Sequence, residues 1–283
     1  MSLRSLFLLL TLAAAPLGVR GAEGEPLRVA LLPDESPATI IQNNQALKSY
    51  LEAALDRKVE LVVTTDYSSM IEAMRFKRID IGYFDPLSYV LAKSRCDIEP
   101  FAAMVSHGKA TYTSYLIANS SSGITRPQDV KGKVVGFGDP ASTSSHLIPR
   151  ALLLKAGLEG GKDYRFHHLG AHDAVARAVQ AGNVQAGGIS RPIFESLVEK
   201  KLVDPAKVIV VAESAPIPNY PWTMRSDLPA PLKERIKAAF LGLSDPAVLK
   251  AFKAQGFAPI ADADYDVLRT TAKVLDLDLE KVK

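Results

Sequence analysis

Cysteine is almost absent from this chain: Cys96 is the only one among 283 residues. A single cysteine excludes disulfide bonds within the chain, so hydrophobic cores must stabilise the fold. Charge of one sign is not in large excess either, because 34 Lys and Arg against 31 Asp and Glu give a formal net charge of +3. Binding to nucleic acid or to a membrane surface needs a strong basic patch, so we expect neither kind of partner.

Long hydrophobic runs are scarce, and the one that stands out lies at the start of the chain, over residues 6–17. Arg4 precedes this run, and small residues including Gly21 and Ala22 follow it. The run is shorter than the ~20 residues that span a bilayer, and its flanks are typical of a cleavable secretory signal peptide. We expect that peptide to cover residues 1–22. An exported chain without disulfide bonds is typical of the bacterial periplasm, where we expect the protein to be located.

Metal-ligand patterns are missing as well, because no group of His, Asp or Glu has the spacing of a metal site. We therefore expect neither a metal ion nor a cofactor.

Short apolar runs alternate with longer stretches of helical periodicity along the rest of the chain. The expected strands are residues 27–32, 59–64, 79–84, 98–105, 112–118, 134–137, 164–169, 186–190 and 208–212. The expected helices are residues 38–55, 68–76, 86–93, 146–156, 173–180, 232–243, 246–255 and 265–274. This order predicts an α/β protein with mainly parallel sheets flanked by helices.

Two extended stretches, residues 107–114 and 215–222, read as crossings between two lobes. Lobe I would then be discontinuous, with residues 23–110 and 217–283, and lobe II would comprise residues 111–216. Two lobes joined in this way leave a cleft between them. Ligands of α/β proteins bind at the carboxyl ends of strands facing such a cleft.

Three consecutive hydroxyl residues, Ser142, Thr143 and Ser144, lie where an expected strand ends and an expected helix begins. The first turn of a helix has unpaired backbone N–H groups and the positive end of the helix dipole. Such a helix start can bind a small oxyanion. It can equally be an ordinary N-cap in a serine-rich turn.

Several longer motifs resemble those of periplasmic phosphonate/phosphite-binding proteins, the substrate-binding subunits of ABC importers. They are residues 66–76, 80–84, 139–144 with Pro149, 257–260 and 264–266. Within that family the chain is most similar to the phosphite-binding branch. The resemblance implies a two-lobed, type II-like periplasmic binding protein that works as a monomer with an inner-membrane ABC permease.

The resemblance also implies a set of ligand-binding residues. The hydroxyl triplet Ser142, Thr143 and Ser144 would hold the phosphonate oxygens together with Tyr67 on lobe I. His172 and Tyr112 fall on two further ligand-binding positions of the family. Each of these side chains could instead have a structural role: Tyr67 and Tyr112 as packed aromatics, and His172 as a helix cap.

Departures from the family pattern bear on the ligand. Binders of aminophosphonates hold the ammonium group with carboxylates, but residues 189–193 and 219–221 contain no acidic residue here. A buried ammonium group without such a partner is costly, so we expect phosphite, methylphosphonate or phosphate. Tyr220 and Trp222 would shrink the pocket toward phosphite.

Asp85 is a second departure, because relatives usually have glycine at this position. It could simply cap the helix that begins at Pro86. Alternatively, it could accept a hydrogen bond from a protonated ligand oxygen, which would select monoanionic phosphite or phosphate over sulfate.

Two other functions remain as alternatives to transport. Ser144, His172 and Asp139 provide the residue types of a hydrolase triad, although the chain has no Gly-x-Ser-x-Gly motif. A sensory protein that binds the same ligand and signals to a membrane kinase would have the same ligand site.

Overall fold

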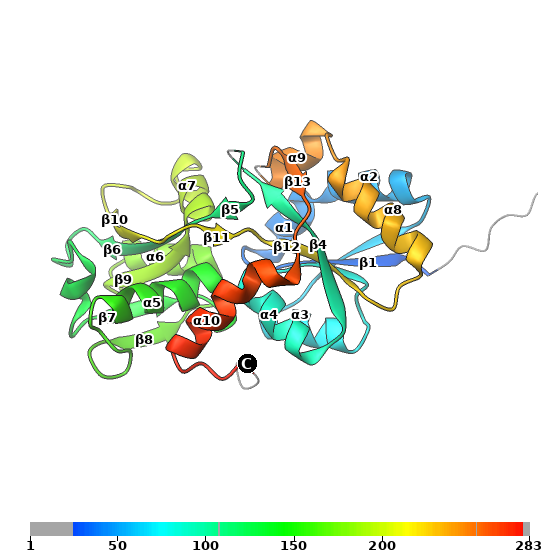
Figure 1. Ribbon diagram of the computed structural model, residues 1–283. Coiled ribbons are helices and arrows are strands. Elements are labelled where there is room, and N and C mark those ends of the chain that lie inside the picture. The colour runs from blue at the N-terminus through cyan, green and yellow to red at the C-terminus, as the bar shows by residue number, and fades with distance from the viewer. Residues whose placement is uncertain (1–24, 107, 253, 280–283) are drawn as a thin grey trace, which may run out of the picture.

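The computed structural model describes residues 25–106, 108–252 and 254–279, and the expected signal peptide lies outside them. The described chain forms two lobes, each built on one sheet that is flanked by helices (Figure 1). This confirms the two-lobed α/β architecture. Within the described ranges, no helix is long and apolar enough to cross a membrane.

The sheet of lobe I has six strands in the order β13-β4-β12-β3-β1-β2. The strands are β1 (Leu27–Leu31), β2 (Val59–Val63), β3 (Ile81–Tyr83), β4 (Ile98–Val105), β12 (Pro221–Arg225) and β13 (Gly256–Ala258). Six helices belong to this part of the chain: α1 (Pro37–Asn43), α2 (Gln45–Leu55), α3 (Tyr67–Arg75), α4 (Pro86–Arg95), α8 (Ala230–Leu241) and α9 (Pro246–Phe252). Side chains alternate along β1, so Val29 packs with α2 and α8 on one face while Ala30 packs with α3 and α4 on the other.

The sheet of lobe II has five strands in the order β10-β6-β9-β7-β8. The strands are β6 (Ser114–Asn119), β7 (Val134–Phe137), β8 (Arg165–His168), β9 (Ala186–Ser190) and β10 (Val208–Glu213). A short 3-10 helix, η1 (Pro127–Val130), precedes β7, and the larger helices are α5 (Ile148–Lys155), α6 (His172–Gln180) and α7 (Arg191–Glu199). Separate apolar clusters cover the two faces of the sheet, one with α5 and the other with α6 and α7.

The sheets are mixed, so the expectation of mainly parallel sheets is wrong. In lobe I, β1 pairs in parallel with β2 and β3, but β12 is antiparallel to both β3 and β4. In lobe II, β7 is parallel to β8 and β9, whereas β6 is antiparallel to β9 and β10. The reason in lobe I is that the chain re-enters from lobe II and runs back through the middle of the sheet as β12.

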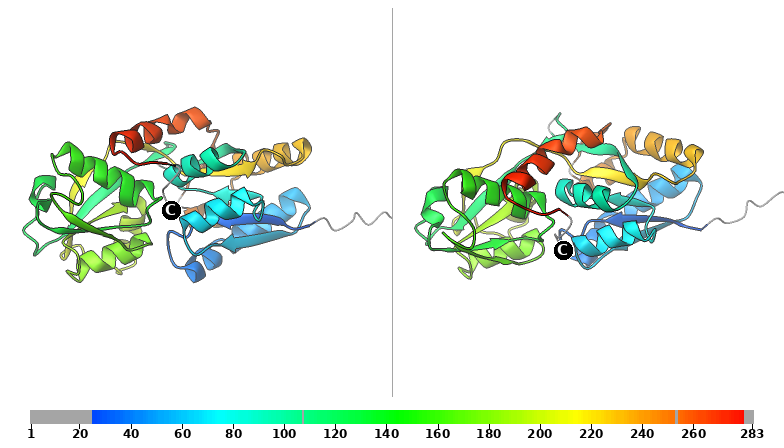
Figure 2. Two further views of the ribbon diagram at one scale, coloured as in Figure 1. Left: turned by 90° about the horizontal axis from the view of Figure 1, so that it is seen from below. Right: turned by 60° about the horizontal axis from the view of Figure 1, so that its bottom comes forward.

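The two expected crossings lie side by side. Their strands β5 (Thr111–Tyr112) and β11 (Ile217–Pro218) form a two-stranded antiparallel ribbon in which Ile217 pairs with Tyr112. A third connection is made by η3 (Asp262–Tyr265) and α10 (Asp266–Val274), and α10 extends from one lobe toward the other in Figure 2. Leu268 and Ala272 of α10 belong to the same apolar cluster as Leu147 of lobe II.

Several expected elements differ from the structure. The single helix expected over residues 38–55 is interrupted at Asn44, whose side-chain amide donates to the Ile40 carbonyl at 2.8 Å. Helix α7 and strand β12 were not expected, because Arg191-Pro192 and Pro221 resemble loop sequences. Proline is nevertheless favoured in the first turn of a helix and is tolerated at the first residue of a strand.

Candidate functional site

The hydroxyl triplet lies directly after β7, at the start of the π-helical turn η2 (Thr143–Leu147), which continues into α5. Asp139 shapes the preceding turn by accepting hydrogen bonds from the backbone N–H groups of Ala141 at 2.8 Å and Tyr67 at 3.3 Å. Ser142 is the N-cap, and its hydroxyl accepts from the Ser145 backbone N–H at 3.2 Å. The predicted helix start is therefore present, and it is buried.

The three hydroxyl groups of the triplet have different surroundings. Ser142 is used as the cap, and Thr143 bonds to residues of lobe I. Ser144 Oγ is buried and has no hydrogen-bond partner in the described part of the chain. A buried hydroxyl without a partner is costly, so Ser144 is the member of the triplet whose hydroxyl remains available as a hydrogen-bond donor.

Asp85 is completely buried and points into this helix start. Its carboxylate oxygens accept from the Thr143 backbone N–H at 2.9 Å and from the Thr143 hydroxyl at 2.8 Å. The Thr143 hydroxyl oxygen in turn accepts from the Leu87 backbone N–H at 2.7 Å. Asp85 occupies the N-cap position of α4, as expected, but the main partner of its side chain is Thr143. A plain helix cap therefore does not fully describe the role of the Asp85 side chain.

Burial raises the pKa of Asp85 to about 7, although the hydrogen bonds from Thr143 lower it. Near neutral pH this carboxyl group is therefore close to half-protonated.

His172 begins α6 and is 1 % exposed. Its Nδ1 accepts a hydrogen bond from the Ser190 backbone N–H at 3.2 Å, so the proton of the neutral ring is on Nε2. Nε2 is buried and has no partner among the residues described. Burial lowers the pKa of His172 to about 4, so the side chain is neutral at physiological pH and offers one N–H donor.

Three buried tyrosines complete the predicted set. Tyr112 on β5 and Tyr220 just before β12 pack edge to face, with ring centroids 5.2 Å apart. Their hydroxyl groups are buried and unpartnered over the described ranges. Burial is the main cause that raises the pKa of Tyr67, Tyr112 and Tyr220 well above the usual range, so all three remain neutral.

A cavity of about 800 Å³ reaches this cluster between the lobes. Tyr112 and Tyr220 lie on its wall, and so does Ser190, the partner of His172. Of the predicted residues, Tyr112 and Tyr220 are therefore on the cavity wall, whereas Tyr67, Asp85, His172 and the hydroxyl triplet are not among the wall residues. Hydrogen bonds connect Asp85 to Thr143 and His172 to the wall residue Ser190. Trp222 is not part of the wall, because it packs inside lobe I against Tyr83 and Phe240.

A family model for periplasmic substrate-binding proteins of phosphonate ABC transporters matches residues 29–265. The chain belongs to this family. It is 28 % identical to the phosphate-import protein PhnD of Mycolicibacterium smegmatis, over 89 % of this chain and 87 % of that protein. It is also 28 % identical to the phosphonates-binding periplasmic protein of Escherichia coli, over 82 % and 71 % of the two chains.

Among solved structures, PhnD1 of Prochlorococcus marinus in complex with methylphosphonate has a TM-score of 0.83 and 20 % identity. The match covers 89 % of this chain and 98 % of that one. At this identity the similarity supports the fold of the phosphonate-binding family.

Most wall residues of this phosphonate-family protein were not predicted as site residues, and two of them have polar side chains at strand ends. Asp34 follows the end of β1, and Tyr83 is the last residue of β3. Both lie at the carboxyl ends of parallel strands, which was the available signal for finding them.

The arrangement suits the binding of an oxyanion by neutral donors. Ser144, Tyr112, Tyr220 and His172 each have a buried polar atom that can donate a hydrogen bond. Hydrogen bonds to an ionised acceptor are stronger than those between neutral groups. The hydrolase alternative requires a different geometry, because a catalytic histidine donates from Nδ1 to a carboxylate, whereas Nδ1 of His172 accepts. No group of three or more potential metal ligands occurs in the described residues.

Proposed function

We propose that this protein captures phosphite, or a small phosphonate without an amine, in the periplasm and delivers it unchanged to an inner-membrane ABC permease. In this proposal the signal peptide of residues 1–22 is removed on export and the protein acts as a monomer. Lobe I comprises residues 23–110 and 217–283, and lobe II comprises residues 111–216. The observation that carries the proposal is the set of buried donors on Ser144, Tyr112, Tyr220 and His172 that have no partner among the residues the structure describes.

The relatives support the ligand class. Their names specify phosphate import and phosphonate binding, and the Prochlorococcus marinus structure contains methylphosphonate. These ligands share a tetrahedral phosphorus atom with several oxygens. Several converging donors can hold such a group when the lobes close around it.

An amine-free ligand is supported by two wall segments, Ser190–Ile193 and Asn219–Tyr220, which contain no carboxylate. The carboxylates elsewhere on the wall are Asp34, Glu35 and Glu199. Although part of the Asp34 residue is exposed, burial of its carboxyl group raises its pKa to about 8. Below that pH the group is mostly protonated, so at neutral pH it provides no full countercharge for an ammonium group.

Calorimetric titration with phosphite, hypophosphite, phosphate, methylphosphonate, 2-aminoethylphosphonate and sulfate tests the proposal. We expect phosphite to bind most tightly and 2-aminoethylphosphonate weakly. If 2-aminoethylphosphonate binds best, the proposed ligand class is wrong. If no phosphorus oxyanion gives a heat of binding, the proposed function as a whole is wrong.

The Ser144→Ala variant tests the site itself. Loss of one hydrogen bond to a charged ligand costs about 1.5–3 kcal/mol, so we expect the dissociation constant for phosphite to rise at least tenfold. Ser94→Ala is the matched control, because the Ser94 hydroxyl donates to the Leu91 carbonyl within α4, away from the cavity wall. Equal affinities for the two variants would remove Ser144 from the site.

A further inference from the structure

The Asp85–Thr143 contact connects the two lobes at the helix start that the family resemblance assigns to the ligand. Asp85 lies between β3 and α4 of lobe I, and Thr143 begins η2 of lobe II. The backbone N–H of Thr143 and its hydroxyl both donate to the carboxylate, and both residues are 0 % exposed. The protein's own carboxylate thus takes the donors at the centre of the hydroxyl triplet.

Hydrogen bonds at Thr143 are the shortest of those described between the two lobes near this helix start. The Thr143 hydroxyl accepts from the Leu87 backbone N–H at 2.7 Å, and Thr143 donates to Asp85 at 2.8–2.9 Å. The Tyr67 backbone N–H donates to Asp139 at 3.3 Å, and the His172 backbone N–H donates to the Asp34 carbonyl at 3.3 Å. Asp85 is therefore the charged acceptor in the polar link that Thr143 makes across this part of the cleft.

The groups that face Asp85 add negative charge or none. The negative charge of Asp139 raises the pKa of Asp85, and the negative charge of Asp85 in turn raises the pKa of Asp34. The other titratable neighbours are neutral tyrosines: Tyr67, Tyr83, Tyr112, Tyr220 and Tyr265. An oxyanion held by Ser144, Tyr112 and Tyr220 would bring another negative charge close to Asp85, with no cationic side chain among these neighbours to offset it.

We propose that Asp85 is a proton-linked specificity residue, which holds the Thr143 donors when it is ionised and takes up a proton from solvent when an oxyanion binds. This inference rests on the proposed function. It differs from acceptance of a hydrogen bond from a protonated ligand oxygen, because here the proton comes from solvent and is bound by the Asp85 carboxyl group itself. The consequence for specificity is that a monoanion, or a ligand that binds together with a proton, is favoured over an unprotonated dianion.

Calorimetric titration with phosphite between pH 6.0 and 8.5 tests this, with each pH measured in two buffers of different ionisation heat. Ionisation of phosphite itself is the same for every variant, so the ratio of the wild-type dissociation constant to that of Asp85→Asn isolates Asp85. We expect this ratio to rise by up to about tenfold per pH unit above pH 7. We also expect wild type to take up as much as one proton more than Asp85→Asn.

One control variant should retain the wild-type profile. Glu60→Gln removes one carboxylate from an exposed position of β2, two strands away from β3 in the lobe I sheet. Loss of the pH-dependent ratio in Glu60→Gln would mean that net charge, and not Asp85, is responsible.

The outcomes distinguish this inference from the proposed function. If wild type binds phosphite but Asp85→Asn shows the same pH profile and proton uptake, the role of Asp85 is wrong and the proposed function stands. If Asp85→Asn and Asp85→Gly are both folded and fail to bind, the carboxylate is needed by the ligand and the inference is also overturned. If wild type binds no phosphorus oxyanion at any pH, the proposed function itself fails.

Discussion

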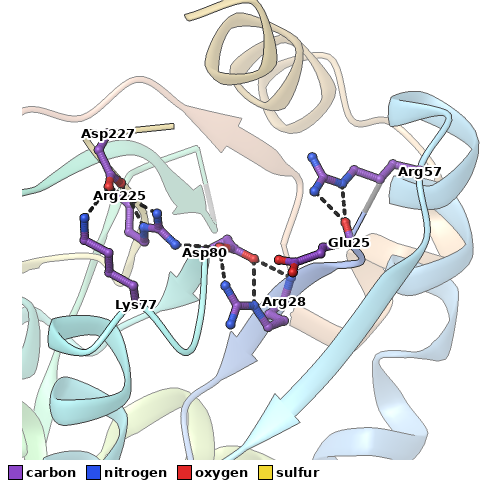
Figure 3. Close-up of polar contacts among 7 residues, drawn as sticks. All are labelled: Glu25, Arg28, Arg57, Lys77, Asp80, Arg225 and Asp227. Carbon is purple, nitrogen blue, oxygen red and sulfur yellow. Dashed lines mark hydrogen bonds and ion pairs between the residues drawn. The ribbon is translucent and has the colours of Figure 1, made fainter. Parts of the chain in front are cut away.

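Two buried aspartates lie on either side of β3 and are stabilised in opposite ways. Asp80, before the strand, accepts from the Arg28 side chain at 2.9 and 3.1 Å and from Arg225 at 2.9 Å. Figure 3 shows its carboxylate between the two guanidinium groups. Asp85, after the strand, accepts from neutral donors, chiefly the backbone N–H and the hydroxyl of Thr143 of the other lobe.

The charge of Asp80 stabilises the fold, whereas the charge of Asp85 depends on what binds beside it. Asp80 is compensated within lobe I by two cations, Arg28 and Arg225, and its side chain is only 9 % exposed. Asp85 has no cation, so its ionisation depends on what else enters the cleft. Neutral donors can therefore keep a binding site sensitive to ligand charge and to pH, whereas ion pairs stabilise the surrounding framework.

The largest expected effect is on stability, in the Asp80→Asn variant. Removing the carboxylate leaves Arg28 without its ion-pair partner and Arg225 with Asp227 alone, so we expect a loss of about 3 kcal/mol in the free energy of unfolding. Urea unfolding measures it, and the affinity for phosphite should be unchanged. Asp227→Asn is the control, since this 44 % exposed carboxylate also pairs with Arg225 and should cost less than about 1 kcal/mol. Equal losses in the two variants would contradict the contrast between buried and exposed pairs.

A smaller effect is expected in the pH dependence of stability. The folded-state pKa of Asp85 is raised to about 7, so its contribution to stability is complete below the unfolded value of about 4 and is lost as the pH rises through 7. Between pH 5 and pH 7, wild type should therefore lose about 2 kcal/mol relative to Asp85→Asn. Urea unfolding without ligand at several pH values provides the measurement. Parallel curves for the two proteins would show that Asp85 is not destabilised when ionised.

The smallest effect is expected for single tyrosine hydroxyls. Tyr112→Phe removes a buried hydroxyl that has no protein partner over the described ranges, so the melting temperature without ligand should not fall. The affinity for phosphite should fall by about tenfold, the cost of one hydrogen bond. Tyr89→Phe should behave in the opposite way, because its hydroxyl donates to Asp262 at 2.5 Å. A lower melting temperature for Tyr112→Phe would indicate a structural role.

Much of the fold could be predicted because it depends on local patterns. Apolar runs such as Val134–Phe137 and the periodicity of residues 266–274 identify strands and helices from neighbouring residues alone. The mixed sheet direction could not be found in this way. It depends on β12, whose proline and aromatic residues resemble a loop until β3 and β4 supply its hydrogen-bond partners.

The candidate site was predictable in its residue types but not in its hydrogen bonds. Ser142 to Ser144 follow a strand and begin a helix, and this order is visible in the sequence. The partner of Thr143 is 58 residues away, and the choice between capping α4 and bonding to Thr143 is made only when the lobes meet. The proton on Nε2 of His172 likewise depends on Ser190, at the end of a separate strand.

The sequence by itself determined the succession of strands and helices, the hydroxyl-rich helix start and the positions of the two crossings, because each depends on residues that are close along the chain. Tertiary structure alone decided that Asp80 has cationic partners and Asp85 neutral ones. The physical reason is that the energy of a buried charge is set by the groups packed around it, and those groups come from distant segments.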